Sequence, residues 1–510
     1  MHTGLLNLVF VVVFLALMAG MGVYFARRNK DTEAYFLGGR KVPGWALGIS
    51  MVGNAISSIT FLALPAAAFA LDWRQLTPNL FMPLAALLAC WLFIPFFRQH
   101  QRVTAYEYLG ERYGQGIRLY AALYNLAGQL LRLAMVLCLM AIPLAEMLHI
   151  RESTAIIVFG GITCFYTVLG GIEAVIWTDV VQTFVLLGGA FLCVGVVLAK
   201  LPGGIIQVFE VGSQFHKFSL GPMDFSLSER TFLLMTLLGL IGFVTEFSSS
   251  QATVQRYIAA PSLKEARKAT LMCALVSLPT WVLFFFLGTC MFVFYQVCPS
   301  PEVAEMTSDN VLPHFILTQL RPGVSGVIIA AIMAAAMSTL SSSINAVSTI
   351  WTVDFLRVLR GRGDDAFELA NARIAACVGG LVMILGAWWM SSISRESLYD
   401  LGSITGAILC FAGLTPFLLG FFVPRVGNRA IVFGMVASLL FSVYNILNYF
   451  DLLPAALALK IHIYAATPIC NAVMLVAALL FAWIAPERNS GRLQGLTVWD
   501  GKPKEVKKNS

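Results

Sequence analysis

The sequence contains few charged residues, since Asp, Glu, Lys and Arg make up only 12% of its 510 residues. A soluble globular domain carries about 25%, so the chain is not a typical soluble protein. It has only 6 histidines and no Cys-x-x-Cys pair, which argues against a zinc module or a disulfide framework. Basic loops beside anionic lipid account for the net charge of +7, and nucleic acid is not an expected partner.

Long apolar stretches dominate the chain, with 58% hydrophobic residues and a mean hydropathy of +0.80. A membrane-spanning helix needs about 20 apolar residues. The sequence therefore predicts an all-α polytopic protein of the lipid bilayer with about thirteen transmembrane helices. The expected spans are 5–26, 44–70, 78–97, 119–148, 153–170, 176–199, 231–250, 270–296, 324–356, 372–391, 401–423, 428–447 and 463–485.

The basic residues indicate how the chain is oriented. None precedes the first stretch, whereas Arg27, Arg28 and Lys30 follow it, which is typical of a retained helix and not of a cleaved signal peptide. Lys and Arg then collect in alternate loops. We therefore expect a multi-pass monomer in the inner (plasma) membrane, with the N-terminus outside and the C-terminus cytoplasmic.

Residues 53–60, Gly-Asn-Ala-Ile-Ser-Ser-Ile-Thr, interrupt the second apolar stretch. Gly53 and Asn54 are poor helix formers, and the nearby hydroxyls compete for backbone groups. A membrane helix can unwind only where the freed backbone groups are satisfied, and in transporters they typically hold a cation beside the substrate. The alternative is a small-residue face that packs against a neighbouring helix.

A second interruption, at residues 243–250, falls in the seventh stretch. Two interrupted helices at matching places indicate an inverted-repeat transporter, here with spans 2–6 and 7–11 as its halves. Gly402, Thr405 and Gly406 make the eleventh stretch bendable, as expected of an outer gate.

The ninth stretch carries a dense run of hydroxyl residues. Ser338, Ser341 and Ser342 share one helix face, and Thr339 and Ser343 lie beside it. Interhelical hydrogen bonding is the alternative role, but it does not require so many hydroxyls. Because hard cations prefer oxygen ligands, the run indicates a Na+ site.

A few polar residues fall inside the expected spans. Arg132 is the only basic residue expected deep in a span, where a charge costs at least about 2.5–3.5 kcal/mol. Its counter-charge is either an anionic substrate group or a carboxylate of Asp179 or Glu246. Asp179 either caps a helix or binds a cation. Gln75 and Asn79 either face a cavity or lie at the membrane interface.

Three motifs match a known family: 170–182 (Gly-Gly-Ile-Glu-Ala-Val-Ile-Trp-Thr-Asp-Val-Val-Gln), 254–257 (Val-Gln-Arg-Tyr) and the serine run at 334–345. With them the chain resembles the sodium/solute symporters, which have the LeuT-type fold. The resemblance implies a 5+5 inverted repeat with broken helices, one extra N-terminal helix and two extra C-terminal helices. The implied division is an N-terminal helix and turn at 1–43, a transport core at 44–424, accessory helices at 425–486 and a disordered tail at 487–510.

The resemblance also implies which residues bind sodium. A first site would use the carbonyl groups of Gly53, Ile56 and Ala335 and the hydroxyls of Ser338 and Thr339. Some members of the family have a second site nearer the inside, which here would use Asp179, Ser338, Ser341 and Ser342. Two Na+ ions per cycle are therefore expected.

Within the family, the chain is most similar to bacterial sialic acid symporters, where an arginine and hydroxyls hold a sugar carboxylate. Arg132, Ser57 and Thr60 match these groups. The other substrate positions depart from that pattern, with Ala55, Gln75, Asn79 and Phe243. The expected function is sodium-coupled uptake of an acidic sugar such as N-acetylneuraminate, and the alternative substrate is a neutral sugar or another small organic solute.

Three other classes of protein are less consistent with the sequence. A membrane-embedded enzyme would need a convergent nucleophile and base or a metal set, and the few ionisable residues expected in the membrane do not form one. A sensor would carry a signalling module, and a channel would have no broken-helix repeat. We therefore expect a transporter and not an enzyme.

Overall fold

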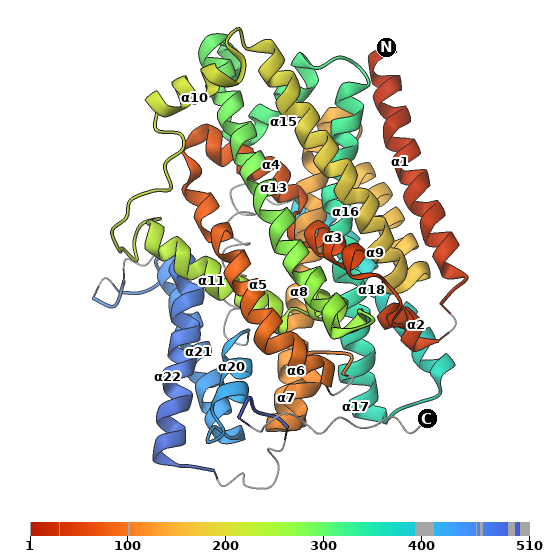
Figure 1. Cartoon of the computed structure of the whole chain (residues 1–510), viewed down its shortest axis with the longest axis vertical. Coiled ribbons are helices and arrows are strands. Elements are labelled where there is room, and N and C mark those ends of the chain that lie inside the picture. The colour runs from red at the N-terminus through yellow and green to blue at the C-terminus, as the bar shows by residue number, and fades with distance from the viewer. Residues whose placement is uncertain are drawn as a thin grey trace.

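The computed structural model describes residues 2–29, 31–99, 102–392, 413–454, 456–459, 463–487 and 495–499, and these residues contain helices and turns but no strand. Figure 1 shows the long helices packed into one bundle. The elements up to residue 200 are α1 (His2–Ala26), α2 (Thr32–Leu37), η1 (Gly38–Arg40), α3 (Gly44–Ala55), α4 (Ser58–Ala70), η2 (Trp73–Phe81), α5 (Met82–Leu88), η3 (Ala89–Phe93), α6 (Ile94–Gln99), α7 (Tyr106–Tyr113), α8 (Gln115–Leu148) and α9 (Glu152–Lys200). The later elements are α10 (Gly204–Gln214), α11 (Phe232–Ser249), α12 (Gln251–Ala259), α13 (Leu263–Val297), α14 (Pro301–Glu305), α15 (Ser308–Gln319), α16 (Val324–Ile350), η4 (Trp351–Leu356), α17 (Arg357–Arg360), α18 (Asp365–Ser391), α20 (Thr415–Phe422), α21 (Asn428–Tyr449) and α22 (Ile463–Ile484).

Within these described ranges, 10 helices are long and apolar enough to cross a membrane, or 11 if the bent pair α3 and α4 counts as one span. The chain is thus a multi-pass membrane protein, as the sequence predicted. The count is lower than thirteen partly because α9 passes through two expected spans, 153–170 and 176–199, without a loop. Most of the expected span 401–423, with Gly402, Thr405 and Gly406, lies outside the described residues.

Helix α9 has a kink at Gly171, where φ is 55° and ψ is −159°. An L side chain rarely adopts this φ. A Cβ at this position would also lie 2.8 Å from the carbonyl oxygen of Tyr35. The kink therefore depends on glycine for two reasons, and it divides α9 into two helical segments.

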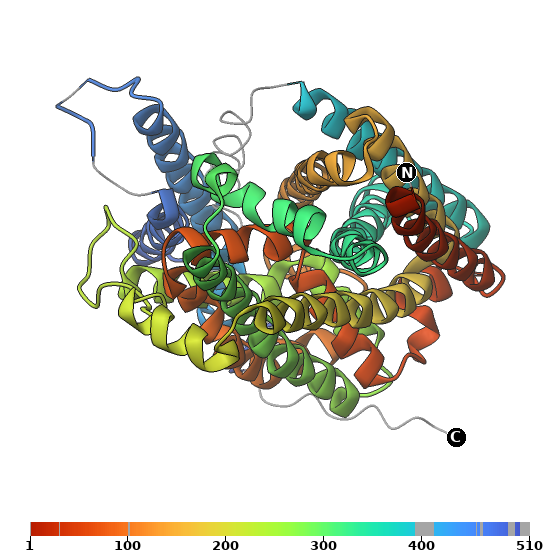
Figure 2. The same cartoon turned by 90° about the horizontal axis from the view of Figure 1, so that it is seen from above.

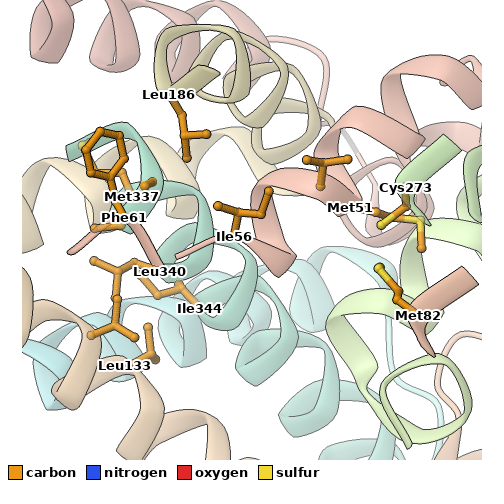
Figure 3. Close-up of a cluster of buried hydrophobic side chains, with 14 of the residues drawn as sticks. Met51, Ile56, Phe61, Met82, Leu133, Leu186, Cys273, Met337, Leu340 and Ile344 are labelled. Atoms are coloured by element: carbon orange, nitrogen blue, oxygen red, sulfur yellow. The ribbon is translucent and has the colours of Figure 1, made fainter. Parts of the chain in front are cut away.

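The expected interruption after Gly53 is present. Helix α3 ends at Ala55, the backbone of Ile56 and Ser57 is extended, and α4 then continues at an angle of 55° to α3. Ile56 and Phe61, on either side of the break, lie in a buried apolar cluster with Leu340 of α16 (Figure 3). Apolar packing thus holds both half-helices against α16.

The second expected interruption is also present, but the chain after it was placed wrongly. Helix α11 ends at Ser249, Ser250 is extended with φ −72° and ψ 114°, and α12 follows immediately. The sequence placed the residues after 250 in an inner loop. All 9 residues of α12 are buried, so this segment belongs to the interior of the bundle.

Helix α16 lies at the centre of the molecule. In its most apolar stretch 89% of the residues are buried, against 33–56% in the other candidate spans. It packs mainly on α9 and α8 and also contacts α1. Figure 2 shows the teal α16 and α18 beside the dark red α1. The serine run of α16 is therefore inside the protein and does not face lipid.

Helices α21 and α22 pack on each other at one side of the bundle, where α22 contacts α11 (Figure 1). Nearby, residues 495–499 fold back onto the chain. The backbone N–H of Val498 donates to the carbonyl oxygen of Phe421, and the Tyr108 hydroxyl donates to that of Leu496. The expectation of disorder from residue 487 onward is thus wrong for this segment, which is anchored by backbone hydrogen bonds and by the buried Leu496.

Candidate functional site

A cavity of about 300 Å³ lies beside the first break. Residues from α3, η2, α5, α8, α11, α12 and α13 line it: Met51, Asn54, Ala55, Pro78, Asn79, Met82, Arg132, Leu238, Gly239, Gly242, Phe243, Glu246, Phe247, Thr253 and Cys273. Figure 3 shows Met51, Met82 and Cys273 gathered from three of these elements. The wall is mostly apolar with a few polar groups, which is typical of a small-molecule site.

Arg132 reaches this cavity from α8. Its Nη2 atom donates to the carbonyl oxygen of Asn54 over a long 3.5 Å. In the part of the chain that the structure describes, no carboxylate lies within 4.0 Å of the guanidinium. Asp179 is paired with another arginine, and Glu246 lines the cavity without an ion-pair contact. Neither carboxylate considered from the sequence is therefore the counter-ion of Arg132.

Glu246 lines the same cavity from the last turns of α11. Its Oε1 atom accepts a hydrogen bond from the hydroxyl of Thr253 in α12. No Lys, Arg or His within the described ranges forms an ion pair with it. The cavity thus contains one positive and one negative side chain, and neither has an ionic partner.

The other substrate positions expected from the sequence are only partly brought together. Asn79 and Phe243 line the cavity, and the Phe243 ring packs on Trp281 with a centroid distance of 5.6 Å. Ser57 lies at the break and Thr60 in the first turn of α4, both half-buried but not in the cavity wall. Gln75 is half-buried in η2 and also lies outside the wall.

Oxygen atoms converge where the broken helix meets α16. The Ser338 hydroxyl lies 2.8 Å from the carbonyl oxygen of Gly53 and 3.1 Å from that of Ala335. The Thr339 hydroxyl lies 3.5 Å from the same Ala335 oxygen. A Cβ at Gly53 would come within 2.9 Å of the Thr183 hydroxyl, so glycine permits this close approach. Ile56, the fifth residue of the expected first site, is buried in the break.

Asp179 lies beside this cluster and is also buried. Its Oδ2 atom accepts hydrogen bonds from Ser50 at 2.6 Å and from Arg256 at 2.9 Å. Among the described residues, only the Ser341 hydroxyl donates a hydrogen bond to its Oδ1 atom, at 3.4 Å. The Ser342 hydroxyl accepts a bond from Arg256. Since the carboxylate contacts side chains of other helices, it does not act as a helix cap.

Arg256 is the residue that the sequence reasoning misplaced. The expected spans 231–250 and 270–296 put Arg256 in a loop between them and leave Arg132 as the only deep basic residue, yet Arg256 is 1% exposed. Two features of the sequence indicate that Arg256 is buried. Its neighbours between Gln251 and Ala259 are uncharged, and Asp179 requires a counter-charge when it is buried. Asp179, Ser338, Ser341 and Ser342 do come together, but Arg256 shares their environment.

Lys217 is another of the buried cations and lies in the turn after α10. Its Nζ atom donates to the carbonyl oxygens of Phe69 at 2.7 Å and Leu71 at 2.9 Å, and it lies 3.9 Å from the ring centroid of Phe292. Burial lowers the pKa of Lys217 to about 8, against the opposing effect of Asp72. The ammonium therefore caps the C-terminal end of α4, at the far end from the break.

Comparison with known proteins gives consistent similarities. The family model described as the sodium:solute symporter family matches residues 35–438. The chain is 34% identical over 445 residues to the sodium/sialic acid symporter SiaT of Proteus mirabilis, covering 86% of this chain and 88% of SiaT. It is 32% identical to the sodium/sialic acid symporter NanT of Aliivibrio fischeri, covering 86% of each chain.

A solved structure of a Na+-coupled sialic acid symporter in a substrate-bound outward-open state is also similar. It superposes with a TM-score of 0.87 and 31% sequence identity, over 94% of this chain and 98% of that chain. The similarity thus extends over nearly the whole fold and includes the helices that form the cavity.

Proposed function

Because the chain belongs to the sodium:solute symporter family, and is accordingly a transporter and not an enzyme, we propose that it imports an acidic sugar together with Na+. N-acetylneuraminate is the substrate we propose, since two relatives of similar length are named sodium/sialic acid symporters. The single observation that carries the proposal is the guanidinium of Arg132, which lines the cavity and pairs with no carboxylate among the described residues.

Arg132 suits a carboxylate ligand for electrostatic reasons. A guanidinium stays protonated in proteins and offers paired donors that fit the two oxygens of a carboxylate. A buried charge without a partner is costly, so a bound anion would stabilise this arrangement. Ser57 and Thr60 are proposed as further donors, because they lie two and five residues after the lining residue Ala55, at the break and in the first turn of α4.

The remaining proposed substrate contacts are Asn79 and Phe243, which line the cavity, and Gln75, which lies in the same element as Asn79. An amide and an aromatic ring are suited to a sugar ring with an N-acetyl group. If the solute is neutral, Gln75, Asn79 and Glu246 would hold its hydroxyls.

We propose that a first Na+ binds among Gly53, Ile56, Ala335, Ser338 and Thr339. The Ser338 hydroxyl already lies within 3.1 Å of the carbonyl oxygens of both Gly53 and Ala335, and such oxygens suit a hard cation. A second Na+ would use Asp179, Ser338, Ser341 and Ser342. The Oδ1 atom of Asp179 faces Ser341 and is not bonded by Arg256, so it is the oxygen best suited to that ion.

The proposed topology has thirteen spans and a 5+5 inverted repeat, with the N-terminus outside and the C-terminus cytoplasmic. The kink at Gly171 and the bent pair α3 and α4 support it, because each accounts for a span that a count of straight helices misses. We also retain the division at 1–43, 44–424 and 425–486, with 487–510 as a C-terminal tail in which residues 495–499 are ordered, and a monomer in the inner membrane.

Uptake by whole cells tests the function. Cells that express the protein should accumulate radiolabelled N-acetylneuraminate when Na+ is present and not when choline replaces it. Glucuronate, glucose and proline complete the panel. Unlabelled N-acetylneuraminate should compete, whereas its methyl ester, which lacks the negative charge, should not. If the ester competes as well as the free acid, Arg132 does not bind a carboxylate and the neutral-sugar alternative is favoured.

A further inference from the structure

Glu246 is a carboxylate of the cavity wall with one oxygen that no described group bonds. Within the described ranges it forms no ion pair, and the nearby buried Arg256 is bonded to Asp179. Its Oε1 atom accepts from Thr253, and no described group donates to Oε2. A carboxylate oxygen on a cavity wall is a hydrogen-bond acceptor, and leaving it without a donor costs free energy.

The charges of Glu246 and Arg132 give the cavity two chemically different sides. Arg132 projects from α8 and Glu246 from α11, and their charged atoms are not within ion-pair distance. The cavity therefore presents a cationic donor from α8 and an anionic acceptor from α11 at separate places on its wall.

From this arrangement we infer that Glu246 determines specificity, by accepting hydrogen bonds from hydroxyl or amino groups at the end of the substrate remote from its carboxylate. The inference rests on the proposed function, because it takes a carboxylate at Arg132 as given. It narrows the substrate class to acids that carry several hydrogen-bond donors, such as acidic sugars.

Electrostatics explains why donor-free acids are excluded. A simple carboxylate could pair with Arg132, but it would leave Glu246 without a donor in a mostly apolar cavity and would place a second negative charge near it. Leaving a buried acceptor or charge unsatisfied is costly. A polyhydroxylated acid satisfies both side chains at once.

A purely structural role for Glu246 is the alternative, since its bond to Thr253 connects α11 to α12 across the second break. The two roles predict different results for two variants. Thr253→Val removes that bond and keeps the negative charge, whereas Glu246→Gln removes the charge and keeps the size of the side chain. The exposed Glu229 provides a matched control, Glu229→Gln.

The test is competition against sodium-dependent uptake of radiolabelled N-acetylneuraminate by two unlabelled acids. One is N-acetylneuraminate and the other is cyclohexanecarboxylate, which has a ring and a carboxylate but no other donor. In the wild type only the sugar acid should compete. In Glu246→Gln its apparent affinity should fall roughly tenfold to a hundredfold, while cyclohexanecarboxylate should become a competitor. Glu229→Gln should retain the selectivity of the wild type, and Thr253→Val, which keeps the negative charge of Glu246, should change the ratio of the two affinities less than Glu246→Gln does.

The gain of competition by cyclohexanecarboxylate separates this inference from a general loss of activity. If Glu246→Gln keeps the wild-type ratio of the two affinities, or if Thr253→Val shifts that ratio equally, Glu246 only stabilises the break and the inference is wrong. If the wild type takes up a different acid of the panel, the proposed substrate is wrong, and the same ratio is measured with that acid. If it takes up only a neutral solute, both proposals are wrong.

Discussion

Arg256 and Asp179 form an ion pair in the interior of the bundle, with a distance of 2.9 Å between Nη2 and Oδ2 and exposed side-chain fractions of 1% and 0%. The pair joins α12, the second half of a broken helix, to α9. The same arginine bonds Ser342 of α16. Three helices therefore meet at the carboxylate proposed to bind a second Na+.

The first prediction concerns the stability of this pair. Arg256→Met should lower the free energy of unfolding by about 3–5 kcal/mol, because it leaves Asp179 buried without a counter-charge. Asp179→Asn combined with Arg256→Met should recover most of the loss, since it removes both charges. Thermal unfolding of the purified variants measures the effect. A double variant that is no more stable than Arg256→Met would contradict the electrostatic explanation.

The second prediction concerns the number of Na+ ions. Asp179→Asn retains acceptors for Ser50 and Arg256 but removes the negative charge. The Hill coefficient for Na+ in uptake should then fall toward one, while some substrate binding remains. Dose-response curves for Na+ at saturating substrate provide the measurement. An unchanged coefficient would show that Asp179 binds Arg256 alone.

The third prediction tests the first sodium site. Ser338→Ala should abolish Na+-stimulated uptake, because it removes a hydroxyl placed between the carbonyl oxygens of Gly53 and Ala335. Ser348→Ala is the matched control, since that buried serine of the same helix bonds Ala372 instead. Uptake by Ser338→Ala that still responds fully to Na+ would rule out this ligand.

The fourth prediction concerns the carboxylate of the substrate. Arg132→Ala should weaken N-acetylneuraminate binding about a hundredfold or more, as expected when a buried charge loses its partner. Arg132→Lys keeps the charge without the paired donors, and its affinity should lie between those of the wild type and Arg132→Ala. Arg151→Ala, at an exposed position, serves as the control. Calorimetric titration of the purified protein in Na+ gives the affinities, and equal affinities for all variants would refute the role of Arg132.

The fifth prediction follows from the lowered pKa of Lys217. In the folded protein Lys217 loses its proton near pH 8, whereas in the unfolded chain it keeps it to about pH 10.5. The unfolded chain thus binds more protons between these values, so this group makes the free energy of unfolding rise with pH there. Locally, the neutral amine no longer has the cation–π contact with Phe292.

Hydrogen exchange can detect this linkage at the helix end that Lys217 contacts. Amide exchange at the C-terminal end of α4, corrected for its intrinsic pH dependence, should slow between about pH 8 and pH 10.5 in the wild type, because an opening that exposes Lys217 then requires the amine to take up a proton. Lys217→Arg remains charged in both states and should show no such slowing. Identical corrected profiles for the two proteins would mean that Lys217 does not control this helix end.

The sequence predicted both helix breaks because their causes are local. Gly53, Asn54 and the hydroxyl clusters disfavour a continuous helix wherever they occur. The serine run of α16 was likewise found from helical periodicity alone. The family membership expected from the motifs was confirmed by the comparisons.

Other features depend on contacts between distant segments, which one sequence does not reveal. Arg256 belongs to a short polar segment that resembles a loop, and only the position of Asp179 on another helix explains its burial. Ser57 and Gln75 lie outside the cavity wall for a similar reason, because a break and a 3-10 helix change the direction of side chains in ways that periodicity does not predict.

The folded-back segment 495–499 has a consequence for how the protein is made. The Tyr108 hydroxyl binds Leu496, a residue 388 positions later in the chain, and Trp499 donates to the carbonyl oxygen of Phe422. Translation adds residues in order, so α7 and α20 form these contacts only after α22 has been synthesised. A chain that ends before residue 495 would therefore leave the Tyr108 hydroxyl and the carbonyl oxygens of Phe421 and Phe422 without these partners.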